Sequence, residues 1–187
     1  MKIISGILKG RKIDGYDTPG TRPTMDRVKE SLFAMIQNEI KDAVVLDLFA
    51  GSGSLGLEAI SNGAKKVYFI DHNKKCIDNI NKHIKLFNVS NYSETLCVDY
   101  KDALNIFKNE NIKFNLIFLD PPYSNSDMPD IIKYIINNDL LDKKAKIICE
   151  LTNRDLIKEY EQLDIIKEKR YSDKYIVIYN RKGEYYG

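Results

Sequence analysis

The segment from Val44 to Gly56 constrains the fold more than any other part of the chain. It reads Val-Val-Leu-Asp-Leu-Phe-Ala-Gly-Ser-Gly-Ser-Leu-Gly, a pattern typical of a buried strand, a glycine turn and then a helix from about Leu55 to Ser61. Gly51, Gly53 and Gly56 have the spacing G-x-G-x-x-G, which allows a tight turn and the close approach of a ligand to the backbone. A strand that runs directly into a helix in this way predicts an open α/β sheet.

Asp47 lies inside the carboxyl end of this strand, where a buried parallel strand usually carries an apolar residue. A dinucleotide site places a pyrophosphate over such a turn, and an added carboxylate would repel it. A ligand that carries an ammonium and a sulfonium would be attracted instead. S-adenosylmethionine has both cations, and its one carboxylate can accept hydrogen bonds from backbone N–H groups at the turn. The sequence therefore predicts S-adenosylmethionine as the cofactor.

Three further predicted strands also end in an aspartate: Lys66–Ile70 precedes Asp71, Glu94–Val98 precedes Asp99, and Phe114–Leu119 precedes Asp120. Ligands of an open α/β sheet bind outside the carboxyl ends of its strands, so these carboxylates and Asp47 should face one crevice. Asp71 is placed for the hydroxyls of a ribose, and Asp99 with Tyr100 for an adenine. The alternative for Asp71 is a helix N-cap or turn residue, and for Asp99 a cap of the helix that follows.

The tetrapeptide Asp120-Pro121-Pro122-Tyr123 is suited to binding a planar amine. Each proline fixes φ and lacks an N–H, so the turn is rigid and its carbonyl groups can face a ligand. Asp120 and the Pro121 carbonyl can accept hydrogen bonds from an exocyclic NH₂, and the Tyr123 ring offers a stacking surface. The alternative is an ordinary proline turn after a strand.

The remaining patterns predict one domain over residues 1–187, with a core from 41 to 187 and an N-terminal extension from 1 to 40. Further core elements are helices near 73–88, 101–107 and 127–138, a fifth strand at 145–151, and an antiparallel pair at 163–169 and 174–179. The extension is expected to form a short hairpin at Lys2–Asp14 and a helix at Thr24–Ile40 with Thr24 as its N-cap.

The extension is locally basic, although the net charge of the chain is only +2. Lys2, Lys9, Arg11 and Lys12 fall within the first twelve residues, which contain no acid. Arg11, Lys12, Arg22 and Arg27 are candidates for contacts with nucleic acid phosphates. Arg22 and Thr24 could instead reach the carboxylate of the methionine moiety, and the sequence does not separate these roles. A solvated surface hairpin is the alternative for the basic residues.

These motifs carry a family resemblance. The Asp-Leu-Phe-Ala-Gly-Ser-Gly segment, the acid after the second strand and the Asp-Pro-Pro-Tyr tetrapeptide resemble the S-adenosylmethionine-dependent class I methyltransferases that act on exocyclic amines of bases. The stretches Ile3-Ile4-Ser5-Gly6 and Arg22 to Phe33 resemble the bacterial enzymes that methylate the N2 amine of one guanine in 16S ribosomal RNA. The similarity covers nearly the whole chain. Many relatives have Phe where this chain has Tyr123, and both rings stack.

The resemblance implies a Rossmann-like, doubly wound, mostly parallel seven-stranded sheet with an antiparallel edge pair. It also implies a target-base role for Asp120 and Tyr123 and a cofactor role for Asp47, Gly51, Gly53, Asp71 and Asp99. With the residues singled out by their position, the predicted catalytic set is Asp120, Pro121 and Tyr123; the cofactor set is Asp47, Phe49, Gly51, Ser52, Gly53, Asp71, His72, Asp99 and Tyr100; the target-binding set is Arg11, Lys12, Arg22, Thr24, Arg27, Pro122 and Tyr123. For His72, a solvent-facing position at a helix start is the alternative. The expected partner is 16S rRNA within the small ribosomal subunit or an assembly intermediate.

Other chemistries find little support in the composition. The chain has three widely spaced cysteines and two histidines, which argues against a zinc site. The absence of a signal peptide or long apolar run predicts a soluble cytoplasmic protein without membrane contact, and a monomer is expected. With only the extension left to choose a target, structured RNA is favoured over a DNA site. A DNA adenine-N6 methyltransferase, a nicotinamide or flavin dehydrogenase and a non-catalytic RNA-binding module remain as alternatives.

Overall fold

A computed structural model of the chain describes residues 1–15, 22–121 and 127–183, with the backbone alone at residues 22–25. Within this part of the chain, seven strands form one sheet of order β3-β2-β1-β4-β5-β7-β6. The strands are β1 (Val44–Asp47), β2 (Lys66–Ile70), β3 (Ser93–Leu96), β4 (Phe114–Leu119), β5 (Leu141–Leu151), β6 (Leu163–Tyr171) and β7 (Lys174–Arg181). The first five strands pair in parallel, while β7 is antiparallel to both of its neighbours, β5 and β6.

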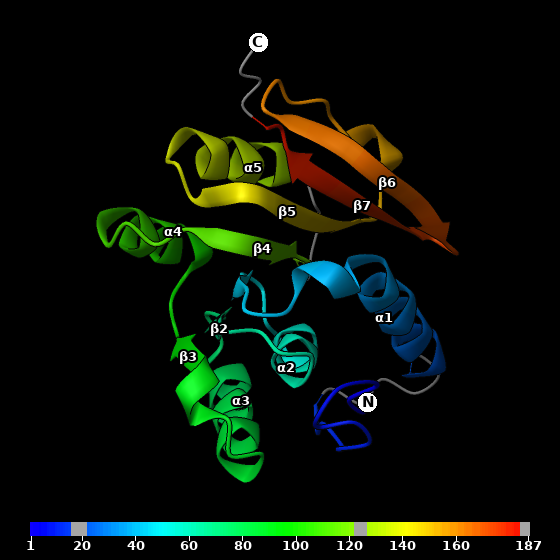
Figure 1. The fold of residues 1–187 in the computed structure, drawn as a ribbon, viewed down its shortest axis with the longest axis vertical. Helices are drawn as coiled ribbons and strands as arrows, with labels where there is room; N and C mark the ends of the chain where they lie inside the picture. The colour runs from blue at the N-terminus through cyan, green and yellow to red at the C-terminus, as the bar shows by residue number, and fades with distance from the viewer. Residues whose placement is uncertain (16–21, 122–126, 184–187) are drawn as a thin grey trace.

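The helices lie on both faces of this sheet (Figure 1). They are α1 (Arg22–Ile36), α2 (Ser54–Ser61), α3 (Lys74–Leu86), α4 (Tyr100–Asn109) and α5 (Met128–Asn137), with the short 3₁₀ helices η1 (Gln37–Glu39), η2 (Ser90–Tyr92) and η4 (Arg154–Leu156). One buried core joins α1, α2 and α3 to the sheet, and a second joins α4 and α5 to its other face. The arrangement is doubly wound, as the sequence predicted.

The two cores follow from the alternation of side chains along each strand. Val45 of β1 belongs to the core under α1, α2 and α3, whereas its neighbour Leu46 belongs to the core under α4 and α5. A parallel strand covered on both faces must be apolar at nearly every position, which is the pattern of β1, β2 and β4. The strand order reverses between β1 and β4, so the crevice that binds ligands in such sheets opens at the carboxyl ends of these two strands.

Helix α3 shows how local sequence sets an element. Asn73 is its N-cap, and the side chain accepts a hydrogen bond of 2.9 Å from the backbone N–H of Lys75. Cys76, Ile77, Ile80 and Ile84 are buried on one face, as their spacing predicts. This helix therefore begins and ends close to the predicted bounds of 73 and 88.

Two predictions for the N-terminal extension are wrong in detail. Helix α1 begins at Arg22, so Thr24 lies inside the first turn and is not the N-cap. Pro23 explains the earlier start, because a proline in the first turn has the required φ and its missing N–H costs no helical hydrogen bond. The segment Lys2–Asp14 forms a tight loop with a single antiparallel bridge between Lys2 and Lys12, and not a regular hairpin.

Other boundaries shift by a few residues. The third strand ends at Leu96, before the predicted end at Val98, because Asp99 already begins the next helix as its N-cap. The fifth strand starts at Leu141, earlier than predicted, with an irregularity in its pairing to β4. The predicted antiparallel pair is confirmed, with Ser172 in the left-handed region at the turn.

Candidate active site

A cleft of about 940 Å³ opens at the carboxyl ends of the central strands. Its wall includes Asp71 after β2, Asp99 before α4, and Asp120 after β4. Three of the four aspartates that the sequence placed at strand ends therefore face one cavity. Its volume lies within the usual range of small-molecule sites.

The turn after β1 forms one side of the cleft, with Gly51, Ser52 and Ser54 on the wall. Gly53 has φ 80°, a conformation that favours glycine, and it directly precedes α2. A Cβ on Gly56 would lie 2.2 Å from the ring of Phe69, so this position needs glycine for the close packing of α2 on β2. The three glycines thus have the structural roles expected from their spacing.

Asp71 ties this turn to the end of β2. Its Oδ2 accepts a 2.9 Å hydrogen bond from the N–H of Gly51, and its Oδ1 accepts one of the same length from the N–H of Asn73. The neighbouring His72 lies on the cleft wall with an exposed imidazole, whose Nδ1 is 3.9 Å from Asp71 Oδ1. Asp71 therefore closes a turn and also presents a carboxylate edge to the cleft.

Asp99 and two aromatic rings form a further part of the wall. Asp99 is the N-cap of α4 and accepts a 2.9 Å hydrogen bond from the N–H of Lys101. The rings of Phe49 and Tyr100 have centroids 5.3 Å apart and both residues line the cleft. A flat heterocycle could be held between such a carboxylate and such rings. The capping role and the ligand-facing position of Asp99 coexist, because only one of its oxygens is used by the cap.

Asp47 is not on the cleft wall. The residue is 2% exposed, and its Oδ2 accepts a 3.2 Å hydrogen bond from the N–H of Gly56 in α2. Burial raises the pKa of Asp47 to about 7, partly offset by that hydrogen bond, and the charge of Asp71 raises it further. Any effect of Asp47 on a bound cation is therefore exerted from beneath the glycine turn.

Asp120 and Pro121 directly follow β4, and both line the cleft. Asp120 is half-buried as a residue, but its carboxyl group is largely removed from water. This burial, together with the adjacent carboxyl group of Glu150, raises the pKa of Asp120 well above its usual range. Pro122 and Tyr123, which carry the predicted stacking role, lie outside the described residues.

Sequence reasoning missed Glu150 and Lys174, which also line the cleft. Lys174 Nζ is 2.8 Å from Glu150 Oε1. Glu150 lies in β5 and Lys174 begins β7, so only the pairing of these strands brings the two side chains together. No local motif marks either residue, and a glutamate near the end of a strand gave no sequence signal of its own.

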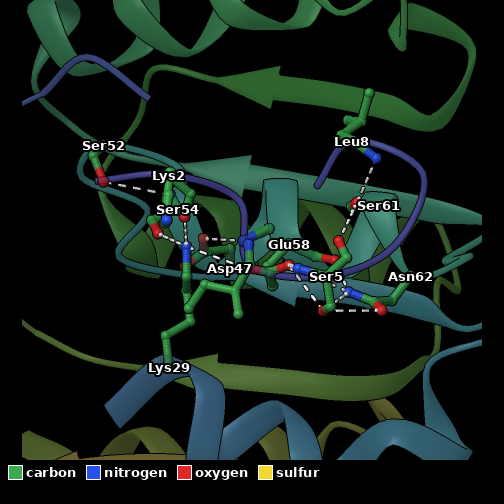
Figure 2. A network of polar contacts seen from close by, with 12 residues as sticks. Lys2, Ser5, Leu8, Lys29, Asp47, Ser52, Ser54, Glu58, Ser61 and Asn62 are labelled. Atoms are coloured by element: carbon green, nitrogen blue, oxygen red, sulfur yellow. Dashed lines mark hydrogen bonds and ion pairs between the residues drawn. The ribbon is translucent and has the colours of Figure 1, made fainter. Parts of the chain in front are cut away.

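A second polar network, shown in Figure 2, joins the N-terminal segment to the helix that follows the glycine turn. Lys29 Nζ of α1 lies 2.8 Å from the Lys2 carbonyl oxygen, 2.9 Å from Ser54 Oγ and 3.2 Å from Glu58 Oε1. Glu58 also accepts hydrogen bonds from the backbone N–H groups of Ile4 and Ser5. The network thus holds the extension against α2, immediately beside the cleft.

The predicted target-binding residues are scattered around the extension. Arg11 and Lys12 are exposed on the N-terminal loop, and the Arg11 guanidinium lies 5.8 Å from the centroid of the Phe87 ring. Arg27 is exposed on α1. The side chains of Arg22 and Thr24 lie outside the described residues. Within the described side chains, Arg11, Lys12 and Arg27 are thus exposed, and their part in target binding stays a prediction.

Two further properties bear on the sequence predictions. No group of three or more His, Cys, Asp or Glu side chains that could hold a metal ion occurs within residues 1–15, 22–121 and 127–183. None of the helices in the described part of the chain has the length and apolar character needed to cross a membrane.

The sheet order and the position of the cleft define the class of protein. They are those of the class I methyltransferases, in which an antiparallel seventh strand is inserted beside the fifth. The solved structure of the putative methyltransferase yhhF from Escherichia coli matches with a TM-score of 0.85 and 27% identity, over 98% of this chain and 99% of that chain. The predicted fold class is confirmed. The class uses S-adenosylmethionine, the cofactor that the sequence predicted.

Sequence comparison identifies the family. The family described as Conserved hypothetical protein 95 matches residues 1–180. The putative rRNA methyltransferase YlbH of Bacillus subtilis is 32% identical, over 98% of this chain and 100% of its own length. Ribosomal RNA small subunit methyltransferase D of Haemophilus influenzae is 35% identical, over 90% of this chain and 88% of its own. The chain belongs to the Conserved hypothetical protein 95 family, and its resemblance to the bacterial ribosomal RNA methyltransferases is confirmed.

Proposed function

We propose that this protein transfers a methyl group from S-adenosylmethionine to the exocyclic N2 amine of one guanine in 16S rRNA, within the small ribosomal subunit or an assembly intermediate. The observation that carries the proposal is the position of Asp120, which follows β4, lines the cleft and begins the sequence Asp-Pro-Pro-Tyr. The names of the curated relatives support ribosomal RNA as the target. The choice of guanine N2 comes from the family resemblance.

The described residues fit the cofactor. Asp71 presents a carboxylate edge for the hydroxyls of a ribose, and Asp99 lies beside the aromatic rings of Phe49 and Tyr100, where an adenine would fit. The N-terminus of α2, just after the glycine turn, offers backbone N–H groups for a carboxylate. When bound, S-adenosylmethionine supplies an activated methyl group. Ser52 and His72 complete the cofactor wall in this proposal.

The chain's own contribution to the reaction is to position and deprotonate the amine. The lone pair of a guanine N2 is delocalised into the ring, so the nitrogen is a poor nucleophile. Hydrogen bonds from both amine protons to Asp120 and to the Pro121 carbonyl would orient it and favour a pyramidal geometry. We also propose that Tyr123 stacks on the extruded base, with Pro122 shaping the turn.

Residues 1–40 are proposed as a target-recognition extension of a single methyltransferase domain whose catalytic core spans 41–187. Lys9, Arg11 and Lys12 are exposed on the N-terminal loop, and Arg27 is exposed on α1, so each is available to phosphates. Arg22 and Thr24 are assigned either to the RNA or to the methionine carboxylate. The Lys29 network supports this division, because it fixes the extension beside the cofactor turn.

The target is tested by methyl transfer from labelled S-adenosylmethionine to three acceptors, namely small ribosomal subunits, free 16S rRNA and duplex DNA. We expect label in the RNA of the small subunit, with the modification mapped to the N2 of one guanine. Label found only on adenine in duplex DNA would overturn the RNA assignment and favour the alternative of a DNA adenine-N6 methyltransferase.

The role of Asp120 is tested by Asp120→Ala. We expect transfer to be abolished, while the affinity for S-adenosylhomocysteine, measured by calorimetry, stays within about twofold because the cofactor wall is intact. Asp155→Ala serves as the matched control, since Asp155 is exposed in η4 and away from the cleft. Unchanged turnover in Asp120→Ala would remove this residue from the mechanism.

A further inference from the structure

The carboxyl group of Asp120 has a neighbour that no sequence motif marks. Leu119 of β4 is paired with Cys149 of β5, so Asp120 and Glu150 follow side by side on adjacent parallel strands. Their carboxyl groups are hydrogen-bonded to each other. Lys174 reaches Glu150 from β7, with a distance of 2.8 Å between Nζ and Oε1. Asp120, Glu150 and Lys174 therefore form a series of three neighbouring ionisable groups along the cleft wall.

Asp120 and Glu150 are both half-buried, and the side chains of Glu150 and Lys174 are 21% and 46% exposed. Both Glu150 and Lys174 line the same cleft as Asp120. A proton that reaches Glu150 from Asp120 can therefore be released to water.

The charges around the pair determine where its proton resides. Two carboxyl groups in contact cannot both ionise without strong repulsion, so they share one proton. Asp47 adds a further carboxyl group on the Asp120 side, from β1. On the Glu150 side, Lys174 supplies a positive charge, and Asp173 acts on Lys174 in turn. Burial by itself would lower the pKa of Lys174, but the contact with Glu150 outweighs this effect and the pKa is raised. This arrangement favours the shared proton on Asp120.

Building on the proposed function, we propose that Glu150 is a positioning residue that receives, through Asp120, the proton released by the methylated amine, and that Lys174 holds the Glu150 side chain in place through its ion pair. After the nitrogen gains its methyl group, it carries a positive charge and one proton too many. That N–H bond breaks and an O–H bond forms on the free oxygen of Asp120. The proton that Asp120 donates to Glu150 moves onto Glu150, which later releases it to water. No oxidant or reductant is required.

A purely structural role for the pair, as a link between β4, β5 and β7, makes different predictions. The variant Glu150→Gln retains size and hydrogen bonding but cannot accept a proton. We expect kcat to fall about 10- to 100-fold, toward the lower end of general acid–base effects because Glu150 acts through Asp120. The affinity for S-adenosylhomocysteine should change less than about twofold. Glu168→Gln, at a surface ion pair of β6 with Arg154, is the matched control.

The pH profile separates the two roles. In the wild type, kcat should fall at low pH as the carboxyl pair that includes Asp120 takes up a second proton, and this acidic limb should be lost in Glu150→Gln. Lys174→Met removes the positive charge beside the pair, so the acidic limb should move to higher pH. The proposal fails if Glu150→Gln retains kcat within about twofold and shows an unchanged profile.

A readout without substrate keeps this inference separate from the assignment of the target. Carbon-13 NMR of labelled aspartate side chains in the ligand-free protein should show one Asp120 signal that titrates well above the ordinary range of the residue. In Glu150→Gln this pKa should fall, because the adjacent carboxyl group is gone. An unchanged Asp120 titration would overturn the shared proton even if methyl transfer to RNA is confirmed. If the pKa of Asp120 falls as expected but the protein methylates no RNA, the shared proton is supported. The proposed function and the relay that rests on it are then refuted.

Discussion

Two clusters of charged side chains lie next to the same cleft and are built in different ways. In the first, the ammonium of Lys29 has three acceptors, one of which is the carboxylate of Glu58, and both residues are at most 5% exposed. In the second, the carboxyl groups of Asp120 and Glu150 have one ammonium near them, that of the half-exposed Lys174, which pairs with Glu150. The first, which we call the closed cluster, pairs one ammonium with one carboxylate and is almost fully buried, although Lys29 reaches the cleft wall; the second, the open cluster, has an excess of carboxyl groups and is more exposed.

The difference indicates what each cluster does. A buried pair whose donors and acceptors are all matched contributes structure, because removal of either partner leaves an uncompensated charge. Carboxyl groups that are forced together hold a proton at a pH where an isolated aspartate has lost it, which is a property that catalysis uses. The Lys29 network thus fixes the extension to α2, while the Asp120 cluster is suited to handling a proton.

The largest effect on stability is expected from breaking the closed cluster. Glu58→Gln leaves the buried ammonium of Lys29 without its counter-charge and weakens the hydrogen bonds to the N-H groups of Ile4 and Ser5. We expect the free energy of unfolding, measured with urea, to fall by about 3–5 kcal/mol. Asp78→Asn, which removes the exposed ion pair with Lys74, is the control and should cause no measurable change. A loss below about 1 kcal/mol in Glu58→Gln would show that the pair is not a structural tie.

A smaller effect, dependent on pH, is expected for Asp47 beneath the open cluster. Its pKa is about 7 in the folded protein and near 4 when unfolded, so the folded state binds the proton more tightly. The stability from this group is fully present below about pH 4 and is lost as the pH rises through 7. Asp47→Asn has no such proton to lose. Between about pH 5 and pH 8, the free energy of unfolding of Asp47→Asn should therefore rise by roughly 2–3 kcal/mol relative to that of the wild type.

Urea unfolding of both proteins across this pH range provides the measurement for Asp47. The hydrogen bond from the Gly56 N–H can be kept by the amide oxygen of asparagine, so the comparison isolates the charge. Stability curves that run parallel for the wild type and Asp47→Asn would contradict the raised pKa.

The smallest effect on stability is expected at the outer end of the open cluster. Lys174 is half-exposed, and water screens its ion pair with Glu150. Lys174→Met should therefore change the free energy of unfolding by less than about 1 kcal/mol, even though it shifts the pH profile of turnover. A loss as large as that of Glu58→Gln would erase the contrast between the two clusters and assign Lys174 a structural role.

The elements and the residues at their ends could be read from local patterns. The glycine turn after β1, the N-capped helix α3 and the strand-end positions of Asp71, Asp99 and Asp120 were all predictable, because each depends on a few adjacent residues. The start of α1 was misplaced because Thr24 is a residue type typical of N-caps while Pro23 is typical of a first turn, so the local signals predict different starts. The burial of Asp47 was also missed, since exposure depends on what packs above a residue.

By itself, the sequence determined the alternation of strands and helices, the family and the line of acidic residues at the strand ends. These follow from periodicity and turn chemistry, which act over a few residues. Only the tertiary structure decided that Glu150 lies against Asp120 with Lys174 beside it, and that Lys29 is enclosed with Glu58. The physical reason is that strand pairing and helix packing join residues distant in the chain, and the resulting burial sets which carboxyl groups keep their protons.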